Sequence, residues 1–314
     1  MSYSSEIKNV LYRIPVKTGH CALAEFCGIL FSSGTVLMSR DGFSIEITSE
    51  NKNTVIKSMN LLSSLTDIPS SFSEILRQPR NKTTYLLSTE KISGEQLSRF
   101  GLEFRYGITL NEDTLSSIVK RKCCRISFLR GAFLGGGSMI DPRKAYHLEI
   151  VLHNSGLAEA VKKILSEEGI PAGISEKKNS YVVYLKELDR IRNFLGTIGA
   201  MKAVLDLDNI KIYKDIRNSI NRVTNFDNAN MDKTIDASQE SIRYIHIVNE
   251  LMGIDRLSPR LREVADLRIT YPEASLSELS EYSGKLSKSC INHRLRKIKE
   301  IALSETLNKG ENQT

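Results

Sequence analysis

Apolar positions in the first two-thirds of the chain form two blocks of the same design. Each block starts with an apolar helix, predicted around Leu23–Phe31 or Ile126–Leu134, that ends at a glycine suited to a helix C-cap, Gly34 or Gly137. A period-2 strand, a helix and a second strand follow in each block, predicted at residues 43–48, 54–65 and 82–87, and again at residues 146–152, 157–168 and 181–185. The pattern predicts an α+β domain built from two similar halves.

The two blocks also keep one register. The segments Gly28–Gly34 and Gly131–Gly137 both read G-x5-G and lie 103 residues apart. The same offset pairs Asn51 with Asn154 and places Ile-Glu-Ile in the first block opposite Leu-Glu-Ile in the second. Several coincidences in one register indicate duplication. We therefore assign residues 1–210 to a duplicated domain, with halves at about 1–105 and 106–210.

Small residues recur on the leading helix of each block. Ala24 and Gly28 lie four residues apart on the first helix, as do Ser127 and Gly131 on the second. Glycine inside a helix costs about 1 kcal/mol relative to alanine. Close approach of two helix backbones would offset that cost. We expect the two helices to pack against each other as the seam of a pseudo-twofold domain.

The segment Phe128–Ser138, FLRGAFLGGGS, resembles the motif helix of the LAGLIDADG homing-endonuclease fold, a duplicated αββαββα unit. The resemblance implies that active members carry an acid just before the last glycine of each motif helix, where it binds the catalytic divalent metal. Ser33 and Gly136 hold those positions here and supply no carboxylate. We predict no catalytic residue, metal, cofactor or enzyme activity. The alternative is a nuclease with an unusual metal site near Asp141, which lies past the glycine in a predicted turn.

The C-terminal pattern predicts an all-α helix-turn-helix domain over residues 241–304. A helix is expected at Ser258–Arg268, and Ser275 with Glu278 has the capping-box spacing that starts a second, short helix. Gly284 supplies the turn between helices. A longer helix follows over about Lys288–Ala302, with apolar residues at helical spacing on one face.

The opposite face of that last helix is basic. Between residues 285 and 299 the chain has six Lys or Arg and no acid. Early exposed residues of a recognition helix reach base edges in the major groove, and nearby cations reach phosphates. The base-edge candidates are Lys288, Ser289, Asn292 and His293. The other DNA-binding candidates are Lys285, Arg294, Arg296 and Lys297, the last three expected at phosphates. The alternative is a solvated basic face on a structural helix.

Read as a whole, the chain resembles the WhiA family of bacterial cell-division and sporulation regulators. The most distinctive segments are Arg130–Pro142, Tyr146–Ile150, Asn221–Thr234 and Leu286–Ile298. The resemblance implies promoter binding, a role in sporulation, division or chromosome segregation, and a partner that is part of the transcription machinery or another regulator. The duplicated domain would then be an interaction or regulatory platform. A division scaffold that binds DNA without sequence specificity remains an alternative.

Residues 211–240 are expected to form a helical, Asn-rich linker. Apolar spacing predicts a helix to about Val223, then an Asn-rich turn, then a second helix from near Thr234 or Ser238. Residues 305–314 are polar and are expected to form a flexible tail.

Composition adds limits rather than a function. The 40% apolar and 26% charged residues are typical of a folded chain, and the net charge of +7 permits a nucleic-acid partner. No segment has the pattern of a membrane span or secretory signal, which favours a cytoplasmic protein. The predicted helix-turn-helix adds the expectation that it binds double-stranded DNA and is nucleoid-associated. The 5 Cys include no C-x-x-C pair, and the 5 His have no metal-ligand spacing. Reduced thiols, without disulfides or a zinc site, are therefore expected.

Overall fold

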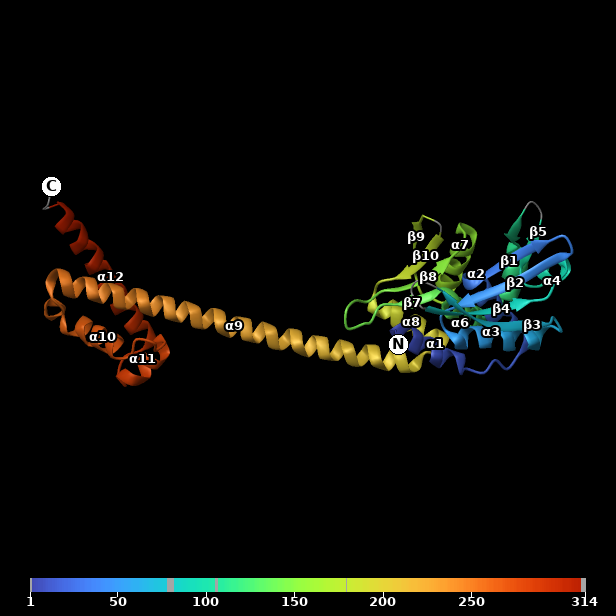
Figure 1. Cartoon of the computed structure of the whole chain (residues 1–314). Helices are drawn as coiled ribbons and strands as arrows, with labels where there is room; N and C mark the ends of the chain where they lie inside the picture. The colour runs from blue at the N-terminus through green and yellow to red at the C-terminus, as the bar shows by residue number, and fades with distance from the viewer. Residues whose placement is uncertain (1, 78–81, 105–106, 179, 312–314) are drawn as a thin grey trace. The chain divides into compact units, whose positions relative to one another are not determined.

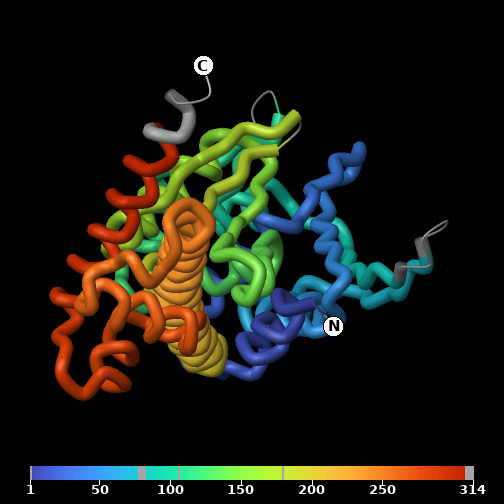
Figure 2. Tube along the Cα trace, turned by 90° about the vertical axis from the view of Figure 1, so that its left-hand side faces the viewer, coloured from blue at the N-terminus to red at the C-terminus, as the bar shows by residue number. Residues whose placement is uncertain are grey.

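The computed structural model, which describes residues 2–77, 82–104, 107–178 and 180–311, divides the chain into two compact units (Figure 1). Unit 1 is Met1–Tyr213 and unit 2 is Lys214–Thr314. Each has its own apolar core. The boundary falls inside helix α9, Met201–Met252, which Figure 2 shows almost along its axis as one unbroken coil from yellow to orange.

Unit 1 repeats one αββαββα order, so the predicted fold class is confirmed. The first half consists of α2 (Gly19–Ser33), β1 (Gly34–Ser39), β2 (Gly42–Ser49), α3 (Lys52–Leu65), β3 (Ser70–Arg77), β4 (Lys82–Thr89) and α4 (Gly94–Ser98). The second half consists of α6 (Lys122–Gly136), β7 (Gly137–Met139), β8 (Leu148–Leu152), α7 (Ser155–Glu167), β9 (Gly173–Lys177), β10 (Ser180–Leu185) and α8 (Leu188–Ile198). Helix α1 (Tyr3–Tyr12) precedes the repeat, and β5 (Leu102–Phe104), β6 (Ile108–Leu110) and α5 (Glu112–Ile118) connect the halves. The expected boundary at 105–106 lies outside the described residues.

The two sheets have equivalent strand orders, β1-β2-β4-β3 and β7-β8-β10-β9, and all their neighbouring strands are antiparallel. Thr35 pairs with Glu46 in the first, and Ser138 pairs with Glu149 in the second. Both pairs are related by the offset of 103 found in the sequence. The duplication therefore extends to strand register.

The helices α2 and α6 end at Gly34 and Gly137 as predicted, but not through a left-handed cap. Both glycines have extended backbones, with φ of −89° and −76°, and lead directly into β1 and β7. A Cβ on Gly34 would lie 2.5 Å from the Leu30 carbonyl oxygen. Steric crowding at the helix end, rather than a positive φ, explains the glycine.

The predicted Asn-rich turn is wrong, because residues 221–234 are helical and lie within α9. The 52 residues of α9 include no Gly or Pro to interrupt the helix. Asparagine costs less than about 1 kcal/mol per residue relative to alanine in a helix. Amide side chains alone therefore do not break a helix that is continuous on both sides.

Unit 2 consists of the later part of α9, a short 3₁₀ turn η1 (Ile254–Arg256), and the helices α10 (Pro259–Thr270), α11 (Leu276–Ser283) and α12 (Lys288–Glu311). Helix α12 continues past Ala302 to Glu311, into the segment predicted as a tail at 305–314, because no proline and, before Gly310, no glycine interrupts it. Residues 312–314 lie outside the described residues. Among the described residues, no helix combines the length and hydrophobicity of a membrane span.

Candidate functional site

The helix-turn-helix of unit 2 is built by local capping. The Ser275 hydroxyl accepts from the backbone N–H of Glu278, and the Glu278 carboxylate accepts from the Ser275 N–H, so α11 starts with the predicted capping box. Gly284 ends α11 with φ of +62°, a left-handed conformation that glycine adopts without strain. Ser287 then accepts from the Cys290 N–H at the start of α12.

The core face of α12 is the predicted one. Ile291, Leu295, Ile298 and Ala302 are buried against α10, α11 and α9. The opposite face is open: among the predicted DNA-binding residues, Lys285, Lys288, Ser289, Asn292, His293, Arg296 and Lys297 are exposed. Lys285 lies in the turn before α12, whereas the other six recur at helical spacing on one outward surface, which we call the α12 outer face.

Arg294 is placed differently from the rest of the predicted set. Its guanidinium donates to the Glu263 carboxylate over 2.8 Å and to the Arg260 carbonyl over 3.1 Å, and its side chain is only 15% exposed. These contacts join α12 to α10. Arg294 thus fixes the recognition helix on its neighbour, a role that the pattern of charges along the sequence could not distinguish from a phosphate contact.

One side of the α12 outer face borders α9. A hollow of about 390 Å³ lies there, and it is lined in part by Lys288 and Asn292 of α12 and by Asn230 and Lys233 of α9. Nearby, Lys299 pairs with Glu240 over 2.6 Å, which holds α9 to α12. The Asn-rich part of α9 therefore contributes to the surface beside the recognition helix.

A buried arginine connects three parts of unit 2. Arg268 of α10 donates to the Ala274 carbonyl over 2.6 Å and to the Ser238 hydroxyl over 3.1 Å, and Ser238 in turn donates to the Pro272 carbonyl. Burial lowers the pKa of Arg268 from its usual value. These carbonyl and hydroxyl contacts fix the loop before α11 against α9. The sequence does not predict this contact, because an arginine near a helix end is usually exposed to solvent.

In unit 1, the predicted seam is confirmed. A Cβ on Gly28 of α2 would lie 2.2 Å from the Phe128 carbonyl oxygen of α6, and one on Gly131 would lie 2.0 Å from the Glu25 carbonyl oxygen. The helix backbones approach so closely that only glycine fits at these two positions.

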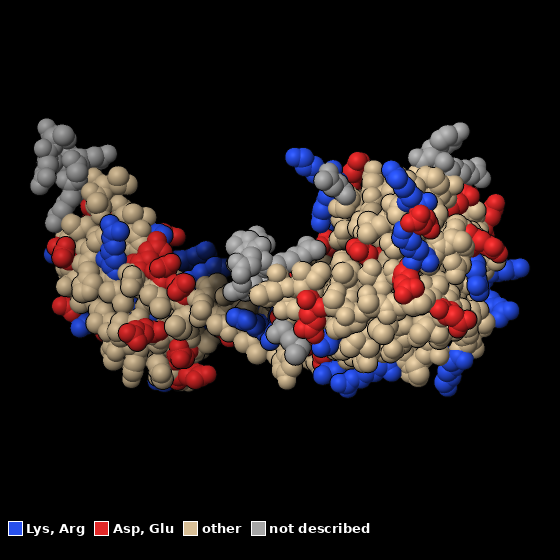
Figure 3. All heavy atoms as spheres, turned by 45° about the vertical axis from the view of Figure 1, so that its right-hand side comes forward, with Lys and Arg blue, Asp and Glu red and all other residues tan. Residues whose placement is uncertain are grey.

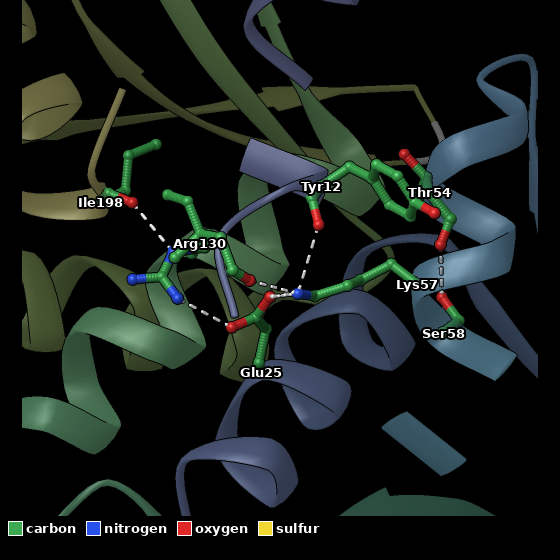
Figure 4. A network of polar contacts seen from close by, with 8 residues as sticks. Tyr12, Glu25, Thr54, Lys57, Ser58, Arg130 and Ile198 are labelled. Carbon is green, nitrogen blue, oxygen red and sulfur yellow. Dashed lines mark hydrogen bonds and ion pairs between the residues drawn. The ribbon is translucent and has the colours of Figure 1, made fainter. Parts of the chain in front are cut away.

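A buried ionic network crosses the seam (Figure 4). Glu25 of α2 is fully buried and pairs with Arg130 of α6 over 2.9 Å and with Lys57 of α3 over 3.6 Å. Arg130 also donates to the Ile198 carbonyl, and Lys57 donates to the Ile14 carbonyl over 2.6 Å. Burial raises the pKa of Glu25, although its two cations oppose that effect. The sequence did not predict this network. The residue equivalent to Glu25 in the second half is Phe128, which is not ionisable, so the repeat gave no sign of an ion pair across the seam.

The C-terminal ends of the seam helices form a hydroxyl-rich groove of about 750 Å³. Ser33 donates to the Ile29 carbonyl of its own helix. Lys8 of α1 donates to the Gly135 carbonyl over 3.4 Å, beside Gly136. Among the described residues that line the groove, Glu50 is the one with a carboxylate side chain. A lysine ammonium group therefore lies beside the helix ends where the homing-endonuclease resemblance implies metal-binding acids.

Asp141 lies in the predicted turn with Pro142 and outside this groove's lining. Its carboxylate accepts from the Arg143 side chain over 2.7 Å, and this bond lowers the pKa of Asp141 to about 2. The face of unit 1 seen in Figure 3 has Lys and Arg side chains interspersed with Asp and Glu.

Comparison with known proteins identifies both units. The model of the WhiA LAGLIDADG-like domain matches residues 23–103 and 125–217, and that of the WhiA C-terminal HTH domain matches residues 220–302. A probable cell division protein WhiA from Alkaliphilus metalliredigens strain QYMF is 38% identical over 314 residues, covering 96% of this chain and 98% of that protein. One from Oceanobacillus iheyensis is 36% identical over 321 residues, covering both chains fully.

Solved structures agree with this assignment. The crystal structure of full-length DUF199/WhiA from "Thermatoga maritima" matches with a TM-score of 0.61 and 29% identity, over 97% of this chain and 99% of that one. The N-terminal LAGLIDADG domain of DUF199/WhiA matches with a TM-score of 0.53 and 27% identity, over 67% of this chain and 96% of that one. From its two matched domains and its full-length relatives, this chain belongs to the WhiA family.

Proposed function

We propose that unit 2 binds double-stranded DNA in a sequence-specific manner, with the start of α12 in the major groove. The observation that carries the proposal is the division of α12 into two faces. Its apolar stripe is buried, whereas Lys288, Asn292, Arg296 and Lys297 are exposed on the α12 outer face. Such a helix presents donors and acceptors to base edges while the domain core holds its orientation.

The exposed residues form two groups, those proposed to contact bases and those proposed to contact phosphates. Lys288, Ser289, Asn292 and His293 lie near the start of α12 and are the proposed base contacts. Asparagine can bond adenine through two hydrogen bonds, which makes Asn292 the sharpest candidate. The proposed phosphate contacts are Lys285, Arg296 and Lys297. Arg294 would act through its bonds to α10, as a positioning residue for the helix.

We further propose that unit 1 is a non-catalytic interaction or regulatory platform. Ser33 and Gly136 offer no carboxylate at the ends of the seam helices, and Lys8 places an ammonium group beside them. A cation there repels a divalent metal ion rather than holding it. The transcription machinery is the proposed partner of this platform.

The proposed biological role is transcriptional regulation in cell division, chromosome segregation and sporulation, carried out in the cytoplasm on the nucleoid. Relatives that match over nearly their full length are named probable cell division protein WhiA, which supports the first of these. A DNA-binding unit tethered to a platform is the architecture that such a regulator needs.

The test compares genome-wide occupancy and footprints of the full chain with those of a Ser289→Ala, Asn292→Ala, His293→Ala triple variant. We expect the variant to lose its site-specific peaks while it still binds arbitrary duplex, because base contacts carry about 1–3 kcal/mol each and phosphate contacts remain. The control is Arg243→Ala, which removes an exposed cation from α9 in the same unit. Peaks that survive the triple substitution would contradict the proposal and move recognition elsewhere.

A second assay separates the alternatives. Mg²⁺-dependent cleavage of supercoiled plasmid, lost on Asp141→Asn, would favour the nuclease. Binding to arbitrary duplex that falls with salt but leaves no footprint would favour the non-specific scaffold. We expect neither result.

A further inference from the structure

Four potential metal ligands meet at the N-terminal ends of the two seam helices. They are His20 and Cys21 near the start of α2, and Cys123 and Cys124 near the start of α6. The ligand atoms of all four lie within 4.8 Å of one another. This cluster lies at the opposite end of the seam helices from the groove that contains Lys8.

The cluster is a product of the duplication. The offset of 103 relates His20 to Cys123 and Cys21 to Cys124, so each half contributes one pair of adjacent residues. Neither pair has a recognised ligand spacing in sequence, and so spacing alone predicted no site. The internal repeat was the signal that could have found it, because residues equivalent in the two halves meet across the pseudo-twofold axis.

The distances within the cluster fit coordination around one centre. The His20 Nδ1 atom lies 3.2 Å from the Cys124 Sγ atom and 3.3 Å from the Cys21 Sγ atom. In a tetrahedral zinc site with ordinary bond lengths, a nitrogen and a sulfur lie about 3.6 Å apart and two sulfurs about 3.8 Å apart. Small side-chain adjustments would therefore suffice to place a metal ion between the four atoms.

Hydrogen bonding satisfies this arrangement poorly. The Nδ1 atom of His20 also lies 3.4 Å from the Thr18 hydroxyl, so three polar groups approach one ring nitrogen. A neutral imidazole nitrogen either donates one hydrogen bond or accepts one. A cation at the centre would engage this nitrogen and both sulfurs at once.

The surroundings permit both entry and retention of an ion. His20 and Cys123 are exposed, Cys21 is half-buried and Cys124 is buried, so the site opens on one side and is packed on the other. The N-terminal ends of two 15-residue helices converge here, and the positive ends of their dipoles attract negative charge. Burial raises the pKa of Cys124 to about 11, so a metal ion must displace the proton of this thiol.

We propose that His20, Cys21, Cys123 and Cys124 form a four-coordinate Zn²⁺ site of the Cys₃His class. Three thiolates and one imidazole are the donors of closed structural zinc sites. Binding of Zn²⁺ releases the thiol protons to solvent, so the affinity for Zn²⁺ increases as the pH rises. The bound ion links the starts of α2 and α6 and thus joins the two halves of unit 1. This site is independent of DNA binding by unit 2.

The experiment uses the full chain, reduced, stripped of metal with a chelator and then titrated with Co²⁺ and Zn²⁺. We expect one equivalent of Co²⁺ to give the visible bands of tetrahedral coordination with thiolate charge transfer, and Zn²⁺ to displace it. Zinc should also raise the melting temperature. Cys123→Ser and His20→Gln change exposed residues and should fold normally, which circular dichroism verifies. Each should weaken Zn²⁺ binding at least about 100-fold. Substituting a residue that only contacts a metal ligand costs up to about 100-fold, and loss of a ligand should cost at least as much.

The matched control is Cys290→Ser, which removes a thiol of unit 2 and should bind Zn²⁺ like the unchanged chain. The proposal is overturned if the unchanged chain takes up no ion more tightly than Cys123→Ser does. It is also overturned if Cys290→Ser reduces uptake as much, or if the thiols near His20 only form a disulfide without retaining zinc.

Discussion

Glu25 and Arg130 connect the two halves of unit 1 through an ion pair of 2.9 Å between Oε2 and Nη1, with the carboxylate fully buried. The pair crosses the seam only a few residues from Gly28 and Gly131, where the helix backbones are closest. Backbone contact and buried charge therefore hold the same interface.

Arg130→Met should lower the free energy of unfolding by about 3–5 kcal/mol, because it leaves Glu25 buried with only Lys57 as its partner. A Glu25→Leu, Arg130→Met double variant should recover part of that loss, because no uncompensated carboxylate remains. The recovery is incomplete because Lys57 loses its acid, although it keeps its bonds to the Tyr12 and Ile14 carbonyls. Urea denaturation measures the free energy of unfolding of the unchanged chain and of both variants. Arg190→Met removes a half-exposed cation that pairs with Glu187 and donates to the Pro171 carbonyl, and it should change stability by less than about 1 kcal/mol. Equal losses in Arg130→Met and Arg190→Met would show that the buried pair has no special weight.

The seam glycines give a steric prediction. Gly28→Ala should destabilise unit 1 by about 3 kcal/mol or more, because its Cβ would overlap the backbone of α6. Gly196→Ala is the control: this glycine lies within α8, and its nearest neighbour would be Val204 Cγ2 at 4.0 Å. It should stabilise the protein by about 0.5 kcal/mol through helix propensity. Thermal melts of both variants check the contrast, which fails if the two changes have the same sign.

Lys8 predicts a pH dependence of stability. Burial lowers its pKa to about 8 from an unfolded value of 10.5. Below pH 8 the lysine is charged in both states and the full burial penalty applies. Between pH 8 and 10.5 the folded chain loses its proton first, so the free energy of unfolding rises with pH. Lys8→Met should lack that rise and be about 2–3 kcal/mol more stable at pH 7.

The measurement is a series of urea melts from pH 7 to 10.5, read as the difference between each variant and the unchanged chain. Lys162→Met, at a position of α7 where the side chain is 44% exposed, controls for other groups that titrate in this range. If the change in the free energy of unfolding has the same pH dependence for Lys8→Met as for Lys162→Met, burial of Lys8 carries no free-energy penalty.

Salt dependence distinguishes the two kinds of arginine on α12. Arg296→Met should reduce the slope of log affinity against log salt by about one, as expected on losing a phosphate contact. Arg294→Met should weaken DNA binding with little change in slope, since its guanidinium is bound to Glu263. The same variant should lower the melting temperature of unit 2. Identical slopes in the two variants would place Arg294 at phosphate instead.

Periodicity predicted the repeat, the seam and the capping box because each depends on residues close in sequence or on one constant offset. The strand register of both sheets followed the same offset. The Asn-rich turn failed for a complementary reason: local propensities of Asn are weak, and the continuity of α9 on either side outweighs them.

The candidate site was predictable only in part. Helical spacing separates the buried Ile291 stripe from the α12 outer face, so exposure there followed from sequence. It does not reveal which cation contacts another helix, and Arg294 differs from Arg296 through its bonds to the Glu263 carboxylate and the Arg260 carbonyl of α10. The buried Glu25 network and the approach of Lys8 to Gly135 likewise depend on tertiary contacts between segments far apart in sequence.

Each seam helix has 15 residues and thus a length of about 22 Å, and it has the thiol cluster near its start and the hydroxyl-rich groove at its end. Groups so far apart share no common partner, and substitutions at one end should add to those at the other with little coupling. The duplicated pair of helices thus has two chemically different ends, with sulfur ligands at one and hydroxyl oxygens at the other. Substitutions can change either end without changing the other.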